Sequence, residues 1–302
     1  MFRTVLIKKA SKLQSIQGYM VAYDGEEEHK VFLDDISSLV IEATGSVVTV
    51  PLMIDLISRN VSVILCDRKH QPIGILSGLN SHHMNSGNLY KQLEWQEERS
   101  KELWKRIVRH KIKMQLKVMR LFETDNTELM EKYFMDVESG DVTNREALAA
   151  KIHFNEIFGK SFSRHEETAV NGMLNYGYAI ILGCVNREIV SSGYLTQLGI
   201  FHRGKTNPFN LSSDFMEPFR PIVDMLVKLS ITMKDPRKAV RKVLTKQMLY
   251  NNERRHVDDV IRLYVMQAIR FMNNETDSEP DLDLLGLDDY KDDEGNAADY
   301  YV

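Results

Sequence analysis

The chain has 302 residues, of which 43% are apolar and 27% are charged, so it is long enough for one or two globular domains. No apolar run approaches the ~18 residues of a membrane span, and the basic start MFRTVLIKKASK lacks the uninterrupted apolar run and cleavage site of a secretory signal. We therefore expect a cytoplasmic protein with no membrane association. The two cysteines, Cys66 and Cys184, are far apart and lack C-x-x-C spacing, so we predict neither a disulfide framework nor a thiolate metal site.

The first 79 residues are predicted to form a small, mostly β domain. Short β-branched runs broken by turns predict strands at residues 4–7, 19–23, 31–33, 39–42 and 61–66. Between the last two runs, VPLMIDLISRN is helix-like, with Leu52, Leu56 and Ile57 on one face. The polar, turn-rich stretch after the last run predicts a linker at residues 80–88.

From residue 89 onwards, apolar residues recur at helical spacing and strand signals almost vanish. The predicted fold class is therefore α+β, with the small β domain followed by a larger all-helical domain at residues 89–273. Within it, residues 101–120 carry eight Lys or Arg against one Glu. Two interpretations stay open: a solvated face whose long side chains cover a core, and a surface that tracks phosphates and extends into residues 236–246.

The net charge of −4 hides a strong asymmetry between the body and the C-terminal segment. Residues 274–302 hold eleven Asp or Glu and a single Lys, so this segment carries −10 and residues 1–273 carry about +6. Because large apolar residues are few there, we predict an acidic, disordered tail that serves as an interaction segment or as an electrostatic shield over the basic body.

The segment GIFHRGKTNPFNLSSDFMEPFRPIVD, residues 199–224, is the first candidate for a reactive site. His202 precedes a turn-rich loop, and two prolines confine the residues after this loop to first helical turns or to a kinked helix. At i, i+3 spacing, Asp214, Glu217 and Arg220 could share one helix face. An imidazole with one or two carboxylates can hold a divalent metal, but a hard cation needs further oxygen ligands.

An acid upstream could supply the missing oxygen. Glu146 lies at the start of an alanine-rich amphipathic helix predicted within residues 141–158. Thr143 and Glu146 also match a capping box, in which the glutamate only ties down a backbone amide. For His202 the alternative is a satisfied structural histidine, and for the two downstream acids it is helix capping and pairing with Arg220. The residues alone leave these alternatives open.

Four segments, in matching order and separation, resemble a known family: WKRIVRHKIKMQ at 104–115, NREALAAKIHF at 144–154, LNYGYAIIL at 174–182, and the segment at 199–224. The family is the CRISPR-associated adaptation integrase, the metal-dependent nuclease-integrase of spacer acquisition. The resemblance covers about residues 1–273, and its most specific part is the H…NLxSDxMEPFRP core of the last segment. The short chain looks most like the type II systems.

The resemblance implies an N-terminal β-sandwich that dimerises, a flexible linker, and a helical catalytic domain that binds DNA. It implies a homodimer, two of which flank a dimer of the small second adaptation protein and hold a DNA duplex with splayed or overhanging 3′ ends. CRISPR repeat DNA is the implied target. For a type II system, the effector nuclease and a further adaptation factor become candidate partners.

The resemblance also implies a metal site. Carried over position by position, the catalytic and metal-binding residues are Glu146, His202 and Glu217, with Asp214 and Arg220 in support. The expected cofactor is Mg²⁺ or Mn²⁺, and an imidazole among the ligands makes Mn²⁺ at least as suitable, since nitrogen is a poorer ligand for the harder ion.

Two positions depart from the family pattern. Ala147 stands where the family often has glycine, and His153 stands where it often has a large aromatic residue. Both lie beside Glu146 and leave that ligand in place. We expect His153 to pack or to lie near DNA rather than to act as a fourth ligand.

The implied reaction is an in-line displacement at the leader–repeat boundary, with a DNA 3′-hydroxyl as nucleophile and the metal polarising the scissile phosphate. With water as nucleophile, the same residues would give an endonuclease or branched-DNA resolvase, and a DNA-binding scaffold is a third interpretation. Sequence-independent contacts to the DNA backbone are expected from Lys105, Arg109, Lys111, Lys113, Arg237, Lys238, Arg241 and Lys242, although one helix cannot present the first four on one side.

Overall fold

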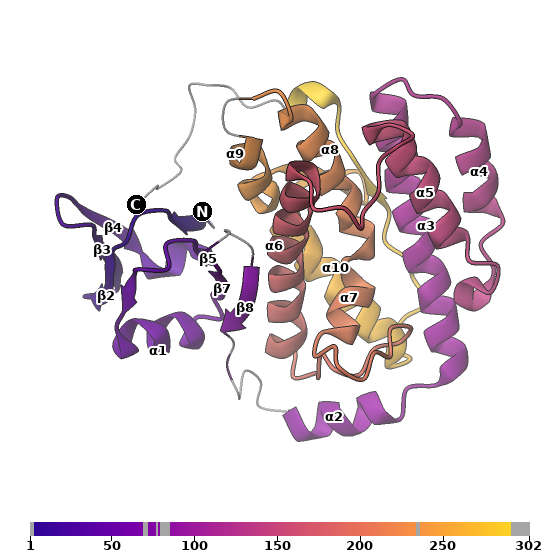
Figure 1. Cartoon of the computed structure of the whole chain (residues 1–302). Coiled ribbons are helices and arrows are strands. Elements are labelled where there is room, and N and C mark those ends of the chain that lie inside the picture. Colours follow the sequence, from indigo (N-terminus) through magenta and orange to yellow (C-terminus); the bar gives the residue numbers. More distant parts are fainter. Residues whose placement is uncertain (1–2, 69–71, 77, 79–84, 234–235, 291–302) are drawn as a thin grey trace.

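The computed structural model describes residues 3–68, 72–76, 78, 85–233 and 236–290. These residues form a β domain and a larger, mainly helical domain that lie side by side, as Figure 1 shows. No helix in this part of the chain is long and apolar enough to cross a membrane.

The β domain consists of two four-stranded sheets and one helix, which agrees with the expected β-sandwich. The first sheet has the order β1 (Arg3–Ile7), β5 (Ile36–Ile41), β7 (Ser62–Cys66), β8 (Pro72–Leu76). The second has the order β4 (Glu28–Phe32), β3 (Tyr19–Tyr23), β2 (Lys12–Ile16), β6 (Val47–Val48). Leu13, Leu39 and Leu52 belong to one buried core that joins both sheets to α1 (Val50–Ser58).

The helical domain contains two long helices with shorter ones around them (Figure 1). Its helices are α2 (Asn85–Leu93), α3 (Glu97–Leu121), α4 (Thr127–Met135), α5 (Arg145–Phe158), α6 (Ala169–Ser191), α7 (Asn210–Met216), α8 (Arg220–Ser230), α9 (Pro236–Arg241) and α10 (Val257–Met272). Helix α6 lies very close to α8 and α9 because Gly177 has no side chain: a Cβ there would lie 2.4 Å from Val223 Cγ1 and 2.7 Å from Val240 Cγ1.

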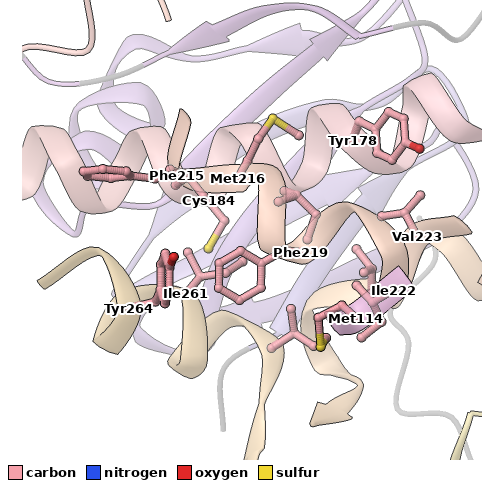
Figure 2. Close-up of a cluster of buried hydrophobic side chains, with 14 of the residues drawn as sticks. Met114, Tyr178, Cys184, Phe215, Met216, Phe219, Ile222, Val223, Ile261 and Tyr264 are labelled. Atoms are coloured by element: carbon pink, nitrogen blue, oxygen red, sulfur yellow. The ribbon is translucent and has the colours of Figure 1, made fainter. Parts of the chain in front are cut away.

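The core of the helical domain lies under the segment that follows α7. Figure 2 shows Phe219 from the short 3₁₀ turn η3 (Glu217–Phe219) among Met114 of α3, Cys184 of α6 and Ile261 of α10. All four side chains are buried. This packing fixes the turn that begins with Glu217, so the position of that carboxylate is set by apolar contacts from three other helices.

The two domains share part of one hydrophobic core. Leu6, Val40 and Ile64 of the first sheet belong to the same buried cluster as the helical domain. Arg187 Nη1 of α6 donates a hydrogen bond to Ser37 O at 2.7 Å across this boundary. The predicted linker at 80–88 is helical at its end, since α2 begins at Asn85, and residues 79–84 lie outside the described part.

The larger domain is not entirely helical, which corrects one prediction. A three-stranded sheet has the order β10 (Glu253–His256), β9 (Gln247–Tyr250), β11 (Leu282–Asp283). The β9–β10 hairpin turns at Asn251 and Asn252, whose φ angles of 49° and 65° match the positive φ that tight hairpin turns require. Strands of two to four residues are too short to produce a clear alternation in the sequence.

The predicted disorder of the acidic C-terminal segment is wrong for residues 274–290. Strand β11 pairs with β9, and Leu282, Leu284 and Tyr290 are buried. Acidic side chains at every second position pair with basic or imidazole side chains of α3: Asp277 with Arg99, Glu279 with Arg106 and His110, Asp281 with Lys113, and Asp283 with Lys117. We call residues 277–283 the acidic strap. Residues 291–302 of the predicted tail lie outside the described residues.

Candidate active site

The candidate site lies where the first turn of α5, the loop before α7, the turn η3 and the middle of α3 meet. Three consecutive helical pieces, α7, η3 and α8, follow one another without a long break, and prolines stand in the first turns of the second and third. This arrangement agrees with the predicted confinement by Pro218 and Pro221, because proline is tolerated at the first helical positions. Glu217 lies at the junction and is buried.

Lys111 lies between two of the predicted ligands. Its Nζ donates hydrogen bonds to Oε1 of Glu146 and to Oε2 of Glu217, and the residue is only 4% exposed. The sequence predicts Lys111 among the surface contacts to DNA, whereas the structure places it inside the site. The two carboxylates therefore converge on one cationic atom.

Glu217 is held as a carboxylate. Burial raises its pKa, but the nearby charges of Arg220 and Lys111 outweigh that effect and lower the pKa to about 2. Arg220 Nη1 donates to Glu217 Oε1 at 2.9 Å, and the guanidinium lies over the ring of Tyr178, 4.3 Å from its centroid. Arg220 therefore positions Glu217.

Asp214 fixes His202 and the chain around it. Its buried carboxylate accepts backbone hydrogen bonds from Ile200 (2.7 Å), Phe201 (3.2 Å) and His202 (3.0 Å). It also accepts from His202 Nδ1 at 2.7 Å, which leaves Nε2 of the imidazole free to act as a ligand or proton acceptor. Asp214 thus faces the histidine loop, whereas Glu217 pairs with Arg220 and Lys111.

The loop that carries His202 depends on a glycine. A Cβ at Gly199 would lie 2.3 Å from His202 O and 2.8 Å from Asp214 Oδ2. The chain can therefore fold around the Asp214 carboxylate only because position 199 has no side chain. This glycine is the first residue of the segment 199–224, and its role could not be recognised without the structure.

The pKa of His202 is raised from its usual value of 6.5. The hydrogen bond to Asp214 is the main cause, burial opposes it, and the negative charges of Asp214, Glu217 and Glu146 add to it. The two glutamates therefore lie close enough to the imidazole to act on its charge. The three predicted ligands share one electrostatic environment.

Glu146 is free of the capping role that the sequence allowed. The N-terminus of α5 is tied down by Asp141, whose carboxylate accepts from the backbone N of Arg145 (2.8 Å) and of Glu146 (3.0 Å). No side-chain capping bond is made by Asn144, the residue before the helix. The Glu146 side chain can therefore point at Lys111, and Asp141 is a supporting residue that the sequence did not reveal.

The chemical types of the three predicted ligands suit a divalent cation. As the side chains stand, no three His, Cys, Asp or Glu residues of the described ranges are close enough together to hold a metal ion. The reason is visible in the geometry: the Lys111 ammonium lies between Glu146 and Glu217, where a cation bound by both would lie. Two carboxylates with His202 beside them form a hard-oxygen and imidazole set that suits Mg²⁺ or Mn²⁺.

The other predicted DNA contacts are distributed over different places. Lys105, Arg109 and Lys242 are half-buried, Lys113 pairs with Asp281 of the acidic strap, and buried Arg241 lies 3.8 Å from Glu42 of the first domain. Arg237 and Lys238 belong to α9, and their side chains lie outside the described part. The basic side chains that the structure describes are therefore in different surroundings, some in ion pairs and one buried at the boundary between the domains.

His153 is a packing residue. It is fully buried, and its Nε2 lies 3.0 Å from Asp224 Oδ2, while the hydroxyl of Tyr178 donates to the other oxygen of Asp224. Because the Tyr178 ring also lies against the guanidinium of Arg220, this buried group stabilises the arginine that positions Glu217. The expectation that His153 packs and does not act as a ligand agrees with this position.

Comparisons with known proteins point to one family. The family model described as CRISPR associated protein Cas1 matches residues 5–257. The CRISPR-associated endonuclease Cas1 of Neisseria meningitidis serogroup C is 37% identical over 229 residues, which cover 75% of each chain. Among solved structures, a casposase bound to its integration product has a TM-score of 0.76 at 18% identity, covering 92% of both chains. A Cas6-RT-Cas1–Cas2 complex has a TM-score of 0.61 at 18% identity, covering 88% of this chain and 32% of that one.

Proposed function

The chain belongs to the family of CRISPR associated protein Cas1, whose members are nuclease and integrase enzymes, and we propose that it inserts foreign DNA fragments as new spacers into a CRISPR array. The reaction is the attack of a DNA 3′-hydroxyl on the phosphodiester at the leader–repeat boundary. The 3′ oxygen forms a bond to phosphorus as the bond to the leaving oxygen breaks, so strands are exchanged without net hydrolysis.

One observation carries the proposal: two glutamates from different helices converge on one cation position beside a histidine whose other ring nitrogen is held by an aspartate. A structural ion pair alone would not need the imidazole, and a structural histidine alone would not need the two glutamates. A metal-dependent phosphoryl-transfer site accounts for both, because carboxylates and an imidazole can together bind the cation that stabilises the charge developing on the phosphate.

We assign the metal-binding role to Glu146, His202 and Glu217, with Mg²⁺ or Mn²⁺ as the ion. When bound, the divalent cation polarises the scissile phosphate. Asp214 holds the imidazole so that Nε2 points away from the Nδ1 hydrogen bond, and Arg220 keeps Glu217 in position. The ammonium of Lys111, which lies in the same site, would add positive charge near the phosphate.

We also propose the partners that this reaction needs. They are a DNA duplex with splayed or overhanging 3′ ends, CRISPR repeat DNA, and the small second adaptation protein, which the solved Cas1–Cas2 complex contains. The effector nuclease and a further type II adaptation factor remain candidates. For the homodimer we propose the outer face of the second β sheet, where Ile16, Tyr19, Tyr23 and Phe32 are exposed.

The test is a joining assay with labelled duplex DNA that has free 3′-hydroxyl ends, a repeat-containing plasmid, and Mn²⁺ or Mg²⁺. Wild-type protein with its small partner should join the fragment to the repeat. Glu146→Gln, Glu217→Gln and His202→Ala should lose joining while remaining folded by circular dichroism. Glu217→Gln should also melt lower, because it removes one partner of a buried ion pair. Full joining activity in folded His202→Ala would overturn the assignment and favour a DNA-binding scaffold.

A second function uses the same residues with water as nucleophile. The related protein from Neisseria meningitidis is named an endonuclease, which favours this candidate as an alternative. The products separate the two functions: joined strands support integration, and only shortened strands support an endonuclease or branched-DNA resolvase.

A further inference from the structure

Phe201, the residue before His202, is an exposed aromatic ring with a rigid backing. Its side chain is 48% exposed, and it stacks on the buried ring of Trp104 with centroids 4.0 Å apart and planes 4° from parallel. Tyr90 is the other exposed aromatic side chain of the helical domain among the described residues, and it lies on α2. One face of the Phe201 ring is thus covered, while its outer side faces solvent.

The ring is fixed relative to the candidate catalytic histidine. The backbone amides of Ile200, Phe201 and His202 all donate to the Asp214 carboxylate. The imidazole of His202 lies edge-on to the Phe201 ring, with centroids 5.5 Å apart and an interplanar angle of 89°. One carboxylate therefore positions both the imidazole and the aromatic platform, and neither can move far without the other.

Two cationic side chains lie next to the platform in the chain. Arg203 and Lys205 follow it in the chain and are exposed. Lys101, one turn before Trp104 on α3, pairs with Glu97 at 2.9 Å, so Arg203 and Lys205 are the cations left to meet a phosphate here. An exposed aromatic face flanked by cations is the arrangement with which proteins bind single-stranded nucleic acid, because every base has a flat face and every nucleotide has a phosphate.

We propose that Phe201 is the stacking subsite for one unpaired nucleobase of the DNA strand whose phosphate lies at His202. The proposal rests on the proposed function, since it places DNA at this site. The Phe201 ring carries no hydrogen-bonding atom, so the subsite accepts any base and selects for a base that is unpaired. A base inside a duplex already stacks on its neighbours and gains little here. The subsite would therefore favour splayed or overhanging ends next to the reacting phosphate.

The test is a binding cycle without metal, so that no strand is cut or joined during the measurement. One DNA carries an ordinary 3′ overhang, and the other carries the same overhang with abasic sugars. Wild-type protein should bind the abasic overhang roughly 5- to 150-fold more weakly, as expected for one stacked base. Phe201→Ala should bind the ordinary overhang as weakly as the abasic one, and Phe201→Trp should restore the difference.

Two further variants keep the result interpretable. Phe201→Leu keeps an apolar contact with Trp104 but has no ring, so it should bind the ordinary and the abasic overhang equally weakly. It provides this test even if Phe201→Ala folds poorly. Tyr90→Ala removes the other exposed ring and should leave the cycle unchanged. If folded Phe201→Leu still distinguishes ordinary from abasic overhangs as wild type does, the subsite is overturned. The subsite is also overturned if the Phe201 variants change binding of the small second adaptation protein but not binding of DNA.

The outcomes separate this proposal from the proposed function. If wild-type protein joins strands but the Phe201 variants still bind both overhangs as wild type does, the subsite is wrong and the proposed integrase function stands. Base-dependent binding in a protein that never joins strands would keep the subsite and remove the integrase. 2-Aminopurine placed in the overhang gives a second readout, because its fluorescence changes when it stacks on a ring.

Discussion

Asp214 accepts a hydrogen bond from both the backbone N and the ring Nδ1 of His202, at 3.0 Å and 2.7 Å. Asparagine at this position would offer one acceptor oxygen and would turn two N–H donors toward a loop that already presents donors. We expect Asp214→Asn to lower strand joining about 10- to 100-fold, the usual loss when a group that orients a metal ligand is removed. The control is Ser213→Ala, a neighbour on α7 whose side chain does not contact the imidazole.

The same pair predicts a pH dependence. Because Asp214 raises the pKa of His202, folding favours its protonated form. The stabilisation that the protonated His202 imidazole contributes is fully present below the unfolded pKa of about 6.5, and it is lost as pH rises through the folded pKa. Metal binding needs the neutral imidazole and should strengthen with pH through that raised value. An NMR titration of the His202 ring in metal-free protein should show the raised pKa, and Asp214→Asn should lower it.

Lys111 predicts a link between metal binding and stability. Its ammonium is buried against Glu146 and Glu217, so Lys111→Met leaves two carboxylates with less positive charge. Breaking a buried ion pair typically costs about 3–5 kcal/mol, so the variant should melt lower than wild type in EDTA. Mn²⁺ should raise its melting temperature more than that of wild type, because the ion replaces the lost charge.

The comparison for this prediction is Lys105→Met, a half-buried position on the same helix. It should change neither the melting temperature in EDTA nor the effect of Mn²⁺. If Lys111→Met has the same melting temperature as wild type in EDTA, the ammonium does not balance the two glutamates, and the role given to Lys111 is wrong.

Local patterns predicted much of the fold. Each of the five predicted β-branched runs overlaps a strand, and the predicted helix at residues 50–60 corresponds to α1, with Leu52 and Leu56 buried. The short strands β9 to β11 were missed because two to four residues carry no periodic signal. In the C-terminal segment, net charge hid an Asp-Leu-Asp-Leu alternation at residues 281–284, which is a strand pattern.

The candidate site was only partly visible in the sequence. The pair Glu217 and Arg220 follows from i, i+3 spacing, and it is a contact in the structure. Bringing Glu146 to the same place required the resemblance, since no local pattern connects α5 with η3. Lys111 was misplaced because eight basic residues on one helix look alike in sequence, and only packing shows which one is buried. Long-range burial is therefore the information that the sequence alone lacked.

The acidic strap predicts that the C-terminal segment supports the fold. Leu282 is fully buried where β11 pairs with β9, so Leu282→Ala should lower the free energy of unfolding by about 2–5 kcal/mol in urea. Asp281→Asn removes an exposed ion pair with Lys113 and should change it by no more than about 1 kcal/mol. A disordered segment would show no change for either variant.

His110 predicts that stability falls in mild acid. Burial lowers its pKa to about 4, although the carbonyl of Pro280 and the charge of Asp281 oppose that effect, while Lys113 favours it. The unfolded chain takes up a proton near pH 6.5 and the folded chain only near pH 4, so stability is full above pH 6.5 and declines between these values. The loss attributable to this residue should approach about 3 kcal/mol, measured by urea unfolding at several pH values.

His110→Phe keeps a ring against Tyr264 but cannot titrate, so its stability should decline less over this range. Parallel curves for wild type and variant would show that His110 takes up its proton equally in both states.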